Sequence, residues 1–195
     1  MNKNEITPKY LRLTEEINAL DYLEKFYFFL SQTNSDIMAW KWVIIALHGA
    51  LYGFAICACK GSSFKNVLNK RIKRKNHLIT FDKALELCQD TNFMHMKKPL
   101  KLTPQQNESV QKLSKLLRDE FVHYVPKNWS IEIHGFPQIV LDVLEIIEFL
   151  LINSGIWSSF NEIQKKKIKS IISQSKCIIE NSTLYKEYKK LKTKD

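Results

Sequence analysis

Arg118 and His123 have the side-chain types that phosphate chemistry uses, and four residues separate them. A guanidinium group binds a phosphate and stabilises negative charge on it. An imidazole titrates near neutral pH, so it can accept or donate a proton during a reaction. These two groups together are sufficient to cleave a phosphodiester without a metal ion. Asp119 lies four residues before His123, within hydrogen-bonding reach on a helix, and can orient the imidazole.

A structural interpretation of Arg118 and His123 stays open beside the catalytic one. On a straight helix the two positions differ by about 140° in direction and about 7.5 Å along the axis. Their convergence on one phosphate therefore requires the long arginine side chain, unwinding near Pro126, or a second subunit. In the structural interpretation, Arg118 pairs with Glu120 or another acid, and His123 caps the C-terminal end of its helix.

The helix that must position these residues is predicted to begin at Thr103. Thr103 is the expected N-cap, Pro104 occupies the first helical position, and Gln106 closes a capping box. The apolar stripe of this helix consists of Val110, Leu113, Leu117 and Phe121. Arg118 and His123 then fall in its last two turns.

Apolar residues three and four positions apart predict the remaining helices. These cover about 15–30, Ser35 or Asp36 to about Cys59, 80–88, 137–153, and a segment after a capping box of Ser159 and Glu162. In the run 137–153 three acids, Asp142, Glu145 and Glu148, are expected to form a solvent face. A basic C-terminal tail at about 180–195 is expected to be frayed. The chain therefore predicts an all-α fold, a single domain over residues 1–195 with about five to six helices in a bundle.

The charge of the chain favours an acidic partner. The formal net charge is +10 and the pI is about 9.4, so RNA, DNA and an anionic membrane surface are candidates. A basic segment between helices, at about 60–78, contains no acid from Lys60 to Lys75. Its candidate phosphate contacts are Lys70, Arg71, Lys73, Arg74 and Lys75. The alternative is that this basic strip is only a solvated connection.

The segment 42–59 contains no Asp, Glu, Lys or Arg and is long enough to span a membrane at the lower limit. Lys41 and Lys60 at its two ends give no orientation bias, and its Gly and Ala residues suit packing within a protein. We expect it to be the central helix of the bundle, without a membrane partner, and His48 to be a hydrogen-bonded core residue. A membrane anchor formed by 42–59 remains an alternative.

The cysteine pattern bears on cofactors and location. The four cysteines, Cys57, Cys59, Cys88 and Cys177, do not match a zinc spacing. We therefore expect no metal and no cofactor. Free thiols, together with a start that lacks a secretory pattern, favour a cytoplasmic location.

The motif Leu117-Arg118-Asp119, followed by Phe121, His123 and Pro126, resembles the end of the catalytic helix in the HEPN superfamily. The resemblance covers about 15–175 in architecture but only about ten residues in motif. Many HEPN proteins are metal-independent endoribonucleases that act as toxins or defence effectors. They are usually homodimers in which two copies of the motif meet in one cleft. The resemblance implies a homodimer that acts on RNA through Arg118 and His123, with a protein antitoxin as a further candidate partner.

One departure from the family pattern keeps a rival function open. The residue after the arginine is commonly Asn in this family, and here it is Asp119. A carboxylate beside a phosphate site disfavours RNA. Asp119 therefore favours the alternative of a non-catalytic helical protein that binds a protein partner or acts as a scaffold.

Overall fold

The computed structural model describes residues 9–69, 77–94, 97–116, 120–121, 128 and 130–193. The described residues form seven α-helices: α1 (Glu15–Leu30), α2 (Ala39–Lys60), α3 (Phe81–Gln89), α4 (Pro104–Lys115), α5 (Phe136–Asn153), α6 (Glu162–Asn181) and α7 (Thr183–Lys192). Two short 3₁₀ helices, η1 (Phe64–Val67) and η3 (Ile156–Ser159), connect them. Within these residues extended backbone pairs only at a single bridge, between Leu68 and Leu78. The predicted all-α bundle is confirmed.

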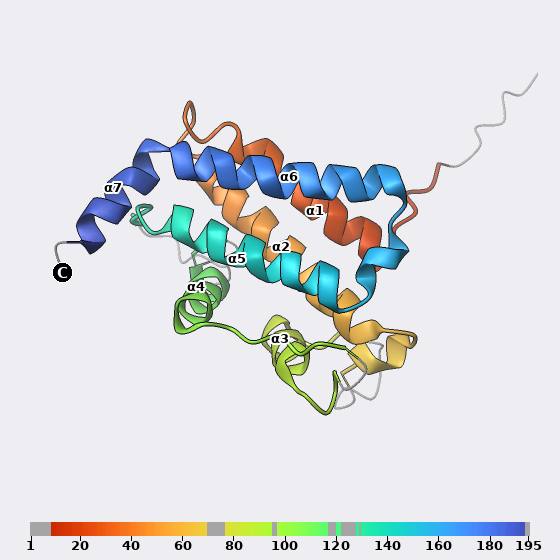
Figure 1. The fold of residues 1–195 in the computed structure, drawn as a ribbon. Coiled ribbons are helices and arrows are strands. Elements are labelled where there is room, and N and C mark those ends of the chain that lie inside the picture. Colours follow the sequence, from red (N-terminus) through yellow and green to blue (C-terminus); the bar gives the residue numbers. More distant parts are fainter. Residues whose placement is uncertain are drawn as a thin grey trace, which may run out of the picture.

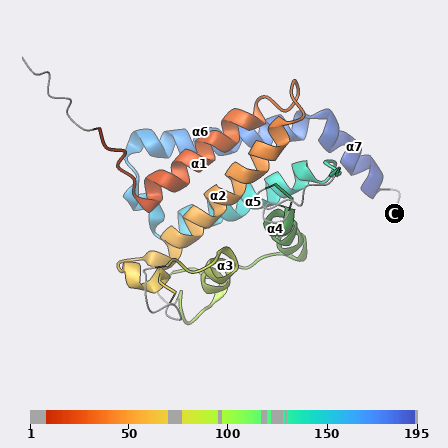
Figure 2. The same ribbon diagram turned by 180° about the vertical axis from the view of Figure 1, so that it is seen from behind.

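Helix α2 is the centre of the bundle, as its apolar composition predicts. It packs lengthwise against α1 on one side, and it also contacts α3, α4 and α5 (Figure 1). The reverse view shows α1 and α2 side by side in front of α6 (Figure 2). By length and composition α2 could cross a membrane, but 67% of its most apolar 18-residue window is buried inside the protein. The surrounding helices therefore account for its apolar surface.

Small residues bring α1 and α2 close together. A Cβ atom added to Gly53 would lie 2.7 Å from the Cβ of Ala19, and one added to Gly49 would enter the ring of Tyr22. Glycine at both positions is therefore what lets α1 lie directly on α2. The same contact fixes the Tyr22 ring over the surface of α2.

Helix α4 begins as predicted and crosses α5. The Thr103 hydroxyl oxygen accepts a hydrogen bond from the Gln106 backbone N–H at 3.1 Å. The Gln106 side-chain oxygen in turn accepts one from the Thr103 backbone N–H. The expectation that Asp142 faces solvent is wrong, since only 5% of it is exposed. Its carboxylate accepts hydrogen bonds from Ser109 and, at 3.3 Å, from Gln105. Packing of α4 over α5 therefore covers one member of the acidic stripe.

Two expectations about the C-terminal third are also wrong. The N-cap of α6 is Asn161, with Gln164 as its capping-box partner, rather than Ser159 with Glu162. The residues expected to fray include a full helix, α7, which begins after the Ser182 cap. Tyr185 of α7 is buried and stacks against Tyr188 at 6.5 Å between ring centroids. Aromatic burial therefore holds a helix whose other side chains are mostly basic.

Candidate functional site

The predicted catalytic and nucleic-acid-binding residues lie outside the described residues. These are Arg118, Asp119 and His123 of the motif, and Lys70, Arg71, Lys73, Arg74 and Lys75 of the basic strip. Their roles therefore stay predictions. The described residues that flank the two segments do show where each segment leaves the bundle.

A cleft of about 530 Å³ opens between α1, α2, the start of α3 and the end of α4. We call it the aromatic cleft, because four rings form much of its wall: Tyr22, His48, Tyr52 and Phe81. Its lining contains the carboxylates of Glu15 and Asp82 and, among the described residues, no lysine or arginine. The cleft is thus an uncharged to acidic surface in a chain whose net charge is +10.

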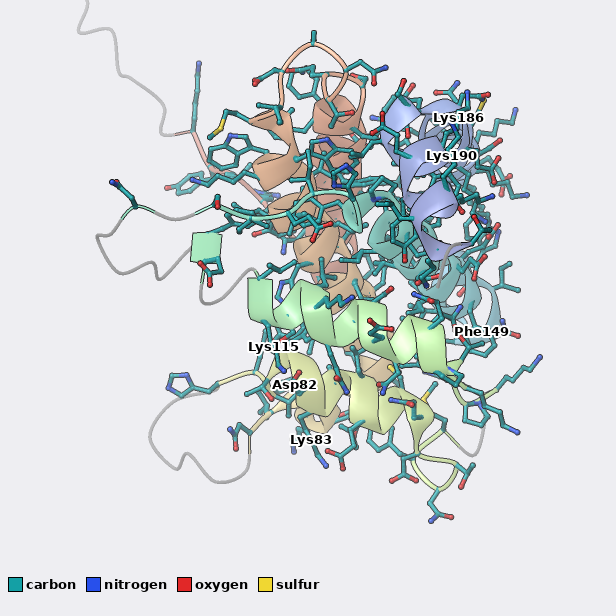
Figure 3. All side chains as sticks on the ribbon, turned by 90° about the vertical axis from the view of Figure 1, so that its left-hand side faces the viewer. Asp82, Lys83, Lys115, Phe149, Lys186 and Lys190 are labelled. Atoms are coloured by element: carbon teal, nitrogen blue, oxygen red, sulfur yellow. The ribbon has the colours of Figure 1, made fainter. Side chains whose placement is uncertain are left out.

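The flanks of both predicted segments meet at the aromatic cleft. Leu78, three residues after the basic strip ends at Lys75, lines the cleft. Ser114, four residues before Arg118, lines it as well. Asp82 on the first turn of α3 and Lys115 at the end of α4 lie on the same side of these neighbouring helices (Figure 3). Both segments are therefore connected to the bundle beside one cleft.

Helical spacing puts the cleft residues on shared stripes. Glu15, Asn18 and Tyr22 follow one another on α1 at intervals of three and four residues, and His48 and Tyr52 do so on α2. Phe81 enters from the first turn of α3, which is set by its N-cap. The Thr80 side chain accepts the Lys83 backbone N–H at 3.3 Å.

The rings of the cleft contact one another in defined geometries. His48 stacks on Phe81, with 4.3 Å between ring centroids and 26° between ring planes. Tyr52 meets Phe81 edge-on, with centroids 6.1 Å apart. The Tyr52 hydroxyl donates a hydrogen bond to the Ile79 carbonyl, just before α3. Tyr52 therefore fixes the start of α3 against α2 and holds Phe81 over His48.

His48 is held by stacking rather than by the hydrogen bond that we expected from its place in α2. Within the described residues no hydrogen bond reaches its ring nitrogens, so that expectation is wrong for this part of the chain. The helical stripe that carries His48 faces the cleft instead of the core.

Burial keeps the side chains of His48 and Tyr52 uncharged at neutral pH. It lowers the pKa of His48 from 6.5 to about 4, although the nearby Asp82 carboxylate opposes the shift. Burial also raises the pKa of Tyr52 above its usual value. At neutral pH His48 is therefore an uncharged ring with one donor and one acceptor nitrogen. The Glu15 carboxylate pairs with Lys60 at 3.2 Å, whereas Asp82 forms no ion pair with the described residues.

A second cleft, of about 610 Å³, lies where α4 ends between α5 and α7. Leu116 and Glu120 line it and directly flank 117–119, which include Arg118 and Asp119. Lys112 and Lys115 contribute the positive charge of the described wall, although Lys112 also pairs with Glu108 at 2.7 Å. We call this the motif-side cleft, since described residues on both sides of 117–119 line it.

The aromatic cleft was missed by inspection of the sequence, for a physical reason. His48 and Tyr52 stand four residues apart in α2, and Gly49 next to them signals a close neighbour. That neighbour, Tyr22, comes from another helix, and Phe81 comes from a third. Only the packing of α1, α2 and α3 brings these rings together.

Among the described residues no three His, Cys, Asp or Glu side chains lie close enough to hold a metal ion. The HEPN resemblance rests on the motif from Leu117 to Pro126 and on an all-helical architecture that many unrelated functions share. Comparison of the chain with known protein families, curated proteins and solved structures found no match.

Proposed function

We propose that this protein is a HEPN-type endoribonuclease that acts as a homodimer and needs no metal ion. The observation that carries the proposal is that described residues near both phosphate-directed segments, Leu78 and Ser114, line the same aromatic cleft. Phosphate contacts, an aromatic surface and an acid–base pair are the parts that cleavage of single-stranded RNA requires. An aromatic cleft whose wall includes residues near both segments favours RNA over other acidic partners.

The basic strip and the aromatic cleft differ in charge and would therefore bind different parts of an RNA strand. Lys70, Arg71 and their basic neighbours would contact RNA phosphates. The aromatic cleft, whose described lining carries carboxylates and no cation, would repel a phosphate but accept an uncharged base. An RNA strand would therefore keep its backbone on the basic strip and motif side.

In the proposed reaction the ribose 2′-oxygen attacks phosphorus and the bond from phosphorus to the 5′-oxygen breaks. His123 takes the proton of the 2′-hydroxyl as general base, or gives a proton to the leaving 5′-oxygen as general acid. Arg118 stabilises the charge that develops on the phosphorane. Asp119 orients the imidazole. The products are a 2′,3′-cyclic phosphate and a 5′-hydroxyl end.

The helix geometry supports two copies of the chain at the site. Arg118 and His123 differ in direction by about 140° on one straight helix, so one copy offers an incomplete pair. A second motif at a two-fold axis would complete it. Light scattering at micromolar concentration is expected to report a dimer, and a monomer would contradict this part of the proposal.

The test uses the full chain and labelled single-stranded RNA in the presence of a chelator. His123→Ala is expected to lose about 10²-fold or more of the cleavage rate, the usual contribution of general acid–base catalysis. The matched control is His134→Ala, which removes a partly exposed histidine that lies 3.5 Å from Glu132. Cleavage that survives His123→Ala, or no cleavage by the wild-type chain, would overturn the enzyme proposal.

A non-catalytic helical module that binds a protein partner or acts as a scaffold is the second candidate. The observation that favours it is Asp119, which places a negative charge next to the arginine that would bind phosphate. Uncut RNA together with weak or absent RNA binding in the same assay would support this candidate. Asp119→Asn would then be expected to strengthen RNA binding, because it removes the repulsive charge.

A further inference from the structure

The aromatic cleft has the composition of a site for a flat, uncharged ligand. His48 and Tyr52 are neutral at neutral pH. Tyr22 is 37% exposed, and its ring lies over Gly49. Ligand sites are typically mostly apolar, with a few polar groups that fix orientation. In this cleft those polar groups are the Asp82 carboxylate and the His48 imidazole.

We propose that the aromatic cleft binds one unpaired base of single-stranded RNA, stacked against its rings. This inference rests on the proposed function, and it names the form of RNA that the protein takes. Proteins recognise unpaired bases by stacking them on aromatic side chains, and every base offers a flat face for this. A base in the cleft leaves its phosphate outside, toward the basic strip.

The Asp82 carboxylate gives the cleft a preference among bases. A carboxylate accepts hydrogen bonds but cannot donate them. Adenine, cytosine and guanine each carry an exocyclic amino group that can donate to it, whereas the N3–H donor of uracil lies between two carbonyl oxygens that a carboxylate repels. The cleft therefore favours a base with an amino group over uracil.

The experiment uses a 2′-O-methyl oligonucleotide, which cannot be cleaved, with a single 2-aminopurine as a fluorescent base. Binding to the full chain is expected to quench the 2-aminopurine by stacking. Tyr22→Leu should lower the affinity by roughly 5- to 100-fold, the usual effect of removing one stacking side chain. The matched control is Phe28→Leu on the same helix, 55% exposed and outside the cleft lining, which should change neither affinity nor quenching.

A second pair of variants tests base preference. Asp82→Asn should reduce the discrimination of an adenine-containing oligonucleotide against its uracil counterpart. Glu86→Gln, on the same helix α3 but paired with Lys83 at 2.6 Å, should leave the discrimination unchanged. Binding without quenching, or equal effects of Tyr22→Leu and Phe28→Leu, would overturn the base site even if unmodified RNA is still cleaved. Quenched binding without cleavage would instead keep the base site and remove only the catalytic proposal.

A different observation concerns two buried cysteines and carries a second inference independently. Cys59 of α2 and Cys88 of α3 are 2% and 0% exposed, and their Sγ atoms are 3.6 Å apart. Each thiol also donates to a carbonyl of the other helix, Cys59 to Ala84 and Cys88 to Ala55. The two sulfurs therefore already face each other across the contact between α2 and α3.

A cavity beside Cys59 gives small reagents a route to one sulfur of the pair. Cys59 lines a cavity of about 390 Å³ together with Lys97, whose Nζ donates to the Ala58 carbonyl at 2.7 Å. The hydrogen bond from Cys88 lowers the pKa of Cys59, burial opposes this, and the Lys97 charge lowers it further. The pKa of Cys88 is raised by the same hydrogen bond and by burial. Cys59, which lines the cavity and lies near the Lys97 charge, is therefore the favoured attacking thiolate.

We infer that Cys59 and Cys88 are a modification site that a peroxide converts to an intramolecular disulfide. The Cys59 thiolate attacks a peroxide oxygen and expels hydroxide, which leaves a sulfenic acid on Cys59. The Cys88 sulfur loses its proton and attacks the Cys59 sulfur, and the hydroxyl group leaves as water. Two thiols become a disulfide, and hydrogen peroxide becomes two waters. The bond closes residues 60–87, which include the basic strip, into one covalent loop.

The test treats the full chain, with Cys177→Ser to remove the exposed thiol, with hydrogen peroxide. Mass spectrometry should show the loss of two hydrogens and a peptide pair that joins Cys59 to Cys88. The Tm should rise by about 5–15 °C and return on reduction. Cys57, whose pKa burial raises to about 12, is the internal control and should stay a thiol. Sulfinic acid on Cys59 without a linked peptide, or linkage through Cys57, would overturn the inference.

Discussion

His48 shows how one residue in an apolar helix can acquire a functional setting. A histidine in the middle of α2 would be costly if it were charged, because burial penalises the charged form. The structure resolves this cost by stacking the ring on Phe81, 4.3 Å away between centroids, and by lowering its pKa to about 4. The ring then behaves as a neutral aromatic surface.

The pKa of His48 predicts a pH dependence of stability. Between pH 6.5 and about 4 the unfolded chain binds a proton at this residue and the folded protein does not. Stability is therefore fully present above pH 6.5 and falls as the pH drops through this window, by at most about 1.4 kcal/mol per pH unit. Urea unfolding of the wild type and of His48→Gln from pH 7 to 5 measures it. Parallel pH profiles for the two proteins would contradict the prediction.

At the scale of elements, the contact between α4 and α5 holds the helix that precedes the motif. The Asp142 carboxylate ties the two helices through Ser109 and Gln105 of α4, and Gln138 donates to it within α5 at 2.9 Å. The motif follows directly after α4. The helix that leads into the motif is therefore held in place by this buried carboxylate.

Removal of the Asp142 carboxylate should be costly. Asp142→Ala is expected to lower the free energy of unfolding by about 2–4 kcal/mol, because a buried Ser109 hydroxyl and two amides lose their charged partner. Glu145→Ala is the control: Glu145 is exposed on the same helix and accepts one bond from Gln106 at 2.9 Å. It should change stability by no more than about 0.5 kcal/mol. Equal losses in both variants, measured by chemical denaturation, would refute this role.

How far the elements could be predicted depended on the range of the interactions. The bounds of α1 and the Thr103 cap of α4 follow from residues within one or two turns, and both predictions are confirmed. Asp142 was predicted to face solvent and the C-terminal tail to fray, and both predictions were wrong. The burial of Asp142 and the helical state of 183–192 depend on partners far along the chain. The aromatic cleft needed three helices to meet. The roles of Arg118 and His123 stay predictions, since both lie outside the described residues.

At the scale of the whole molecule, the lysines of α7 and the cations of the basic strip are two separate groups of positive charge in the sequence. Lys186 and Lys190 lie on α7 at the upper right of the view, whereas Asp82 at the aromatic cleft lies at the lower left (Figure 3). We expect only the cations of the basic strip to neutralise phosphates. The net charge of +10 by itself would not distinguish these two groups.

Salt dependence separates local from general charge effects. Lys73→Ala with Arg74→Ala should reduce the slope of log K against log salt for single-stranded RNA by about 1.4, two phosphates at about 0.7 each. Lys186→Ala with Lys190→Ala removes the same charge and should leave the slope unchanged. Equal slopes in the two double variants would show that the basic strip is only a solvated connection.

The most direct test of the central claim is the chemistry of the RNA ends. Wild-type protein is incubated with single-stranded RNA in a chelator, and the ends of the products are identified by mass spectrometry. Metal-independent catalysis by Arg118 and His123 predicts a 2′,3′-cyclic phosphate and a 5′-hydroxyl, because the 2′-oxygen is the nucleophile. Products with a 3′-hydroxyl and a 5′-phosphate, or uncut RNA, would contradict the account.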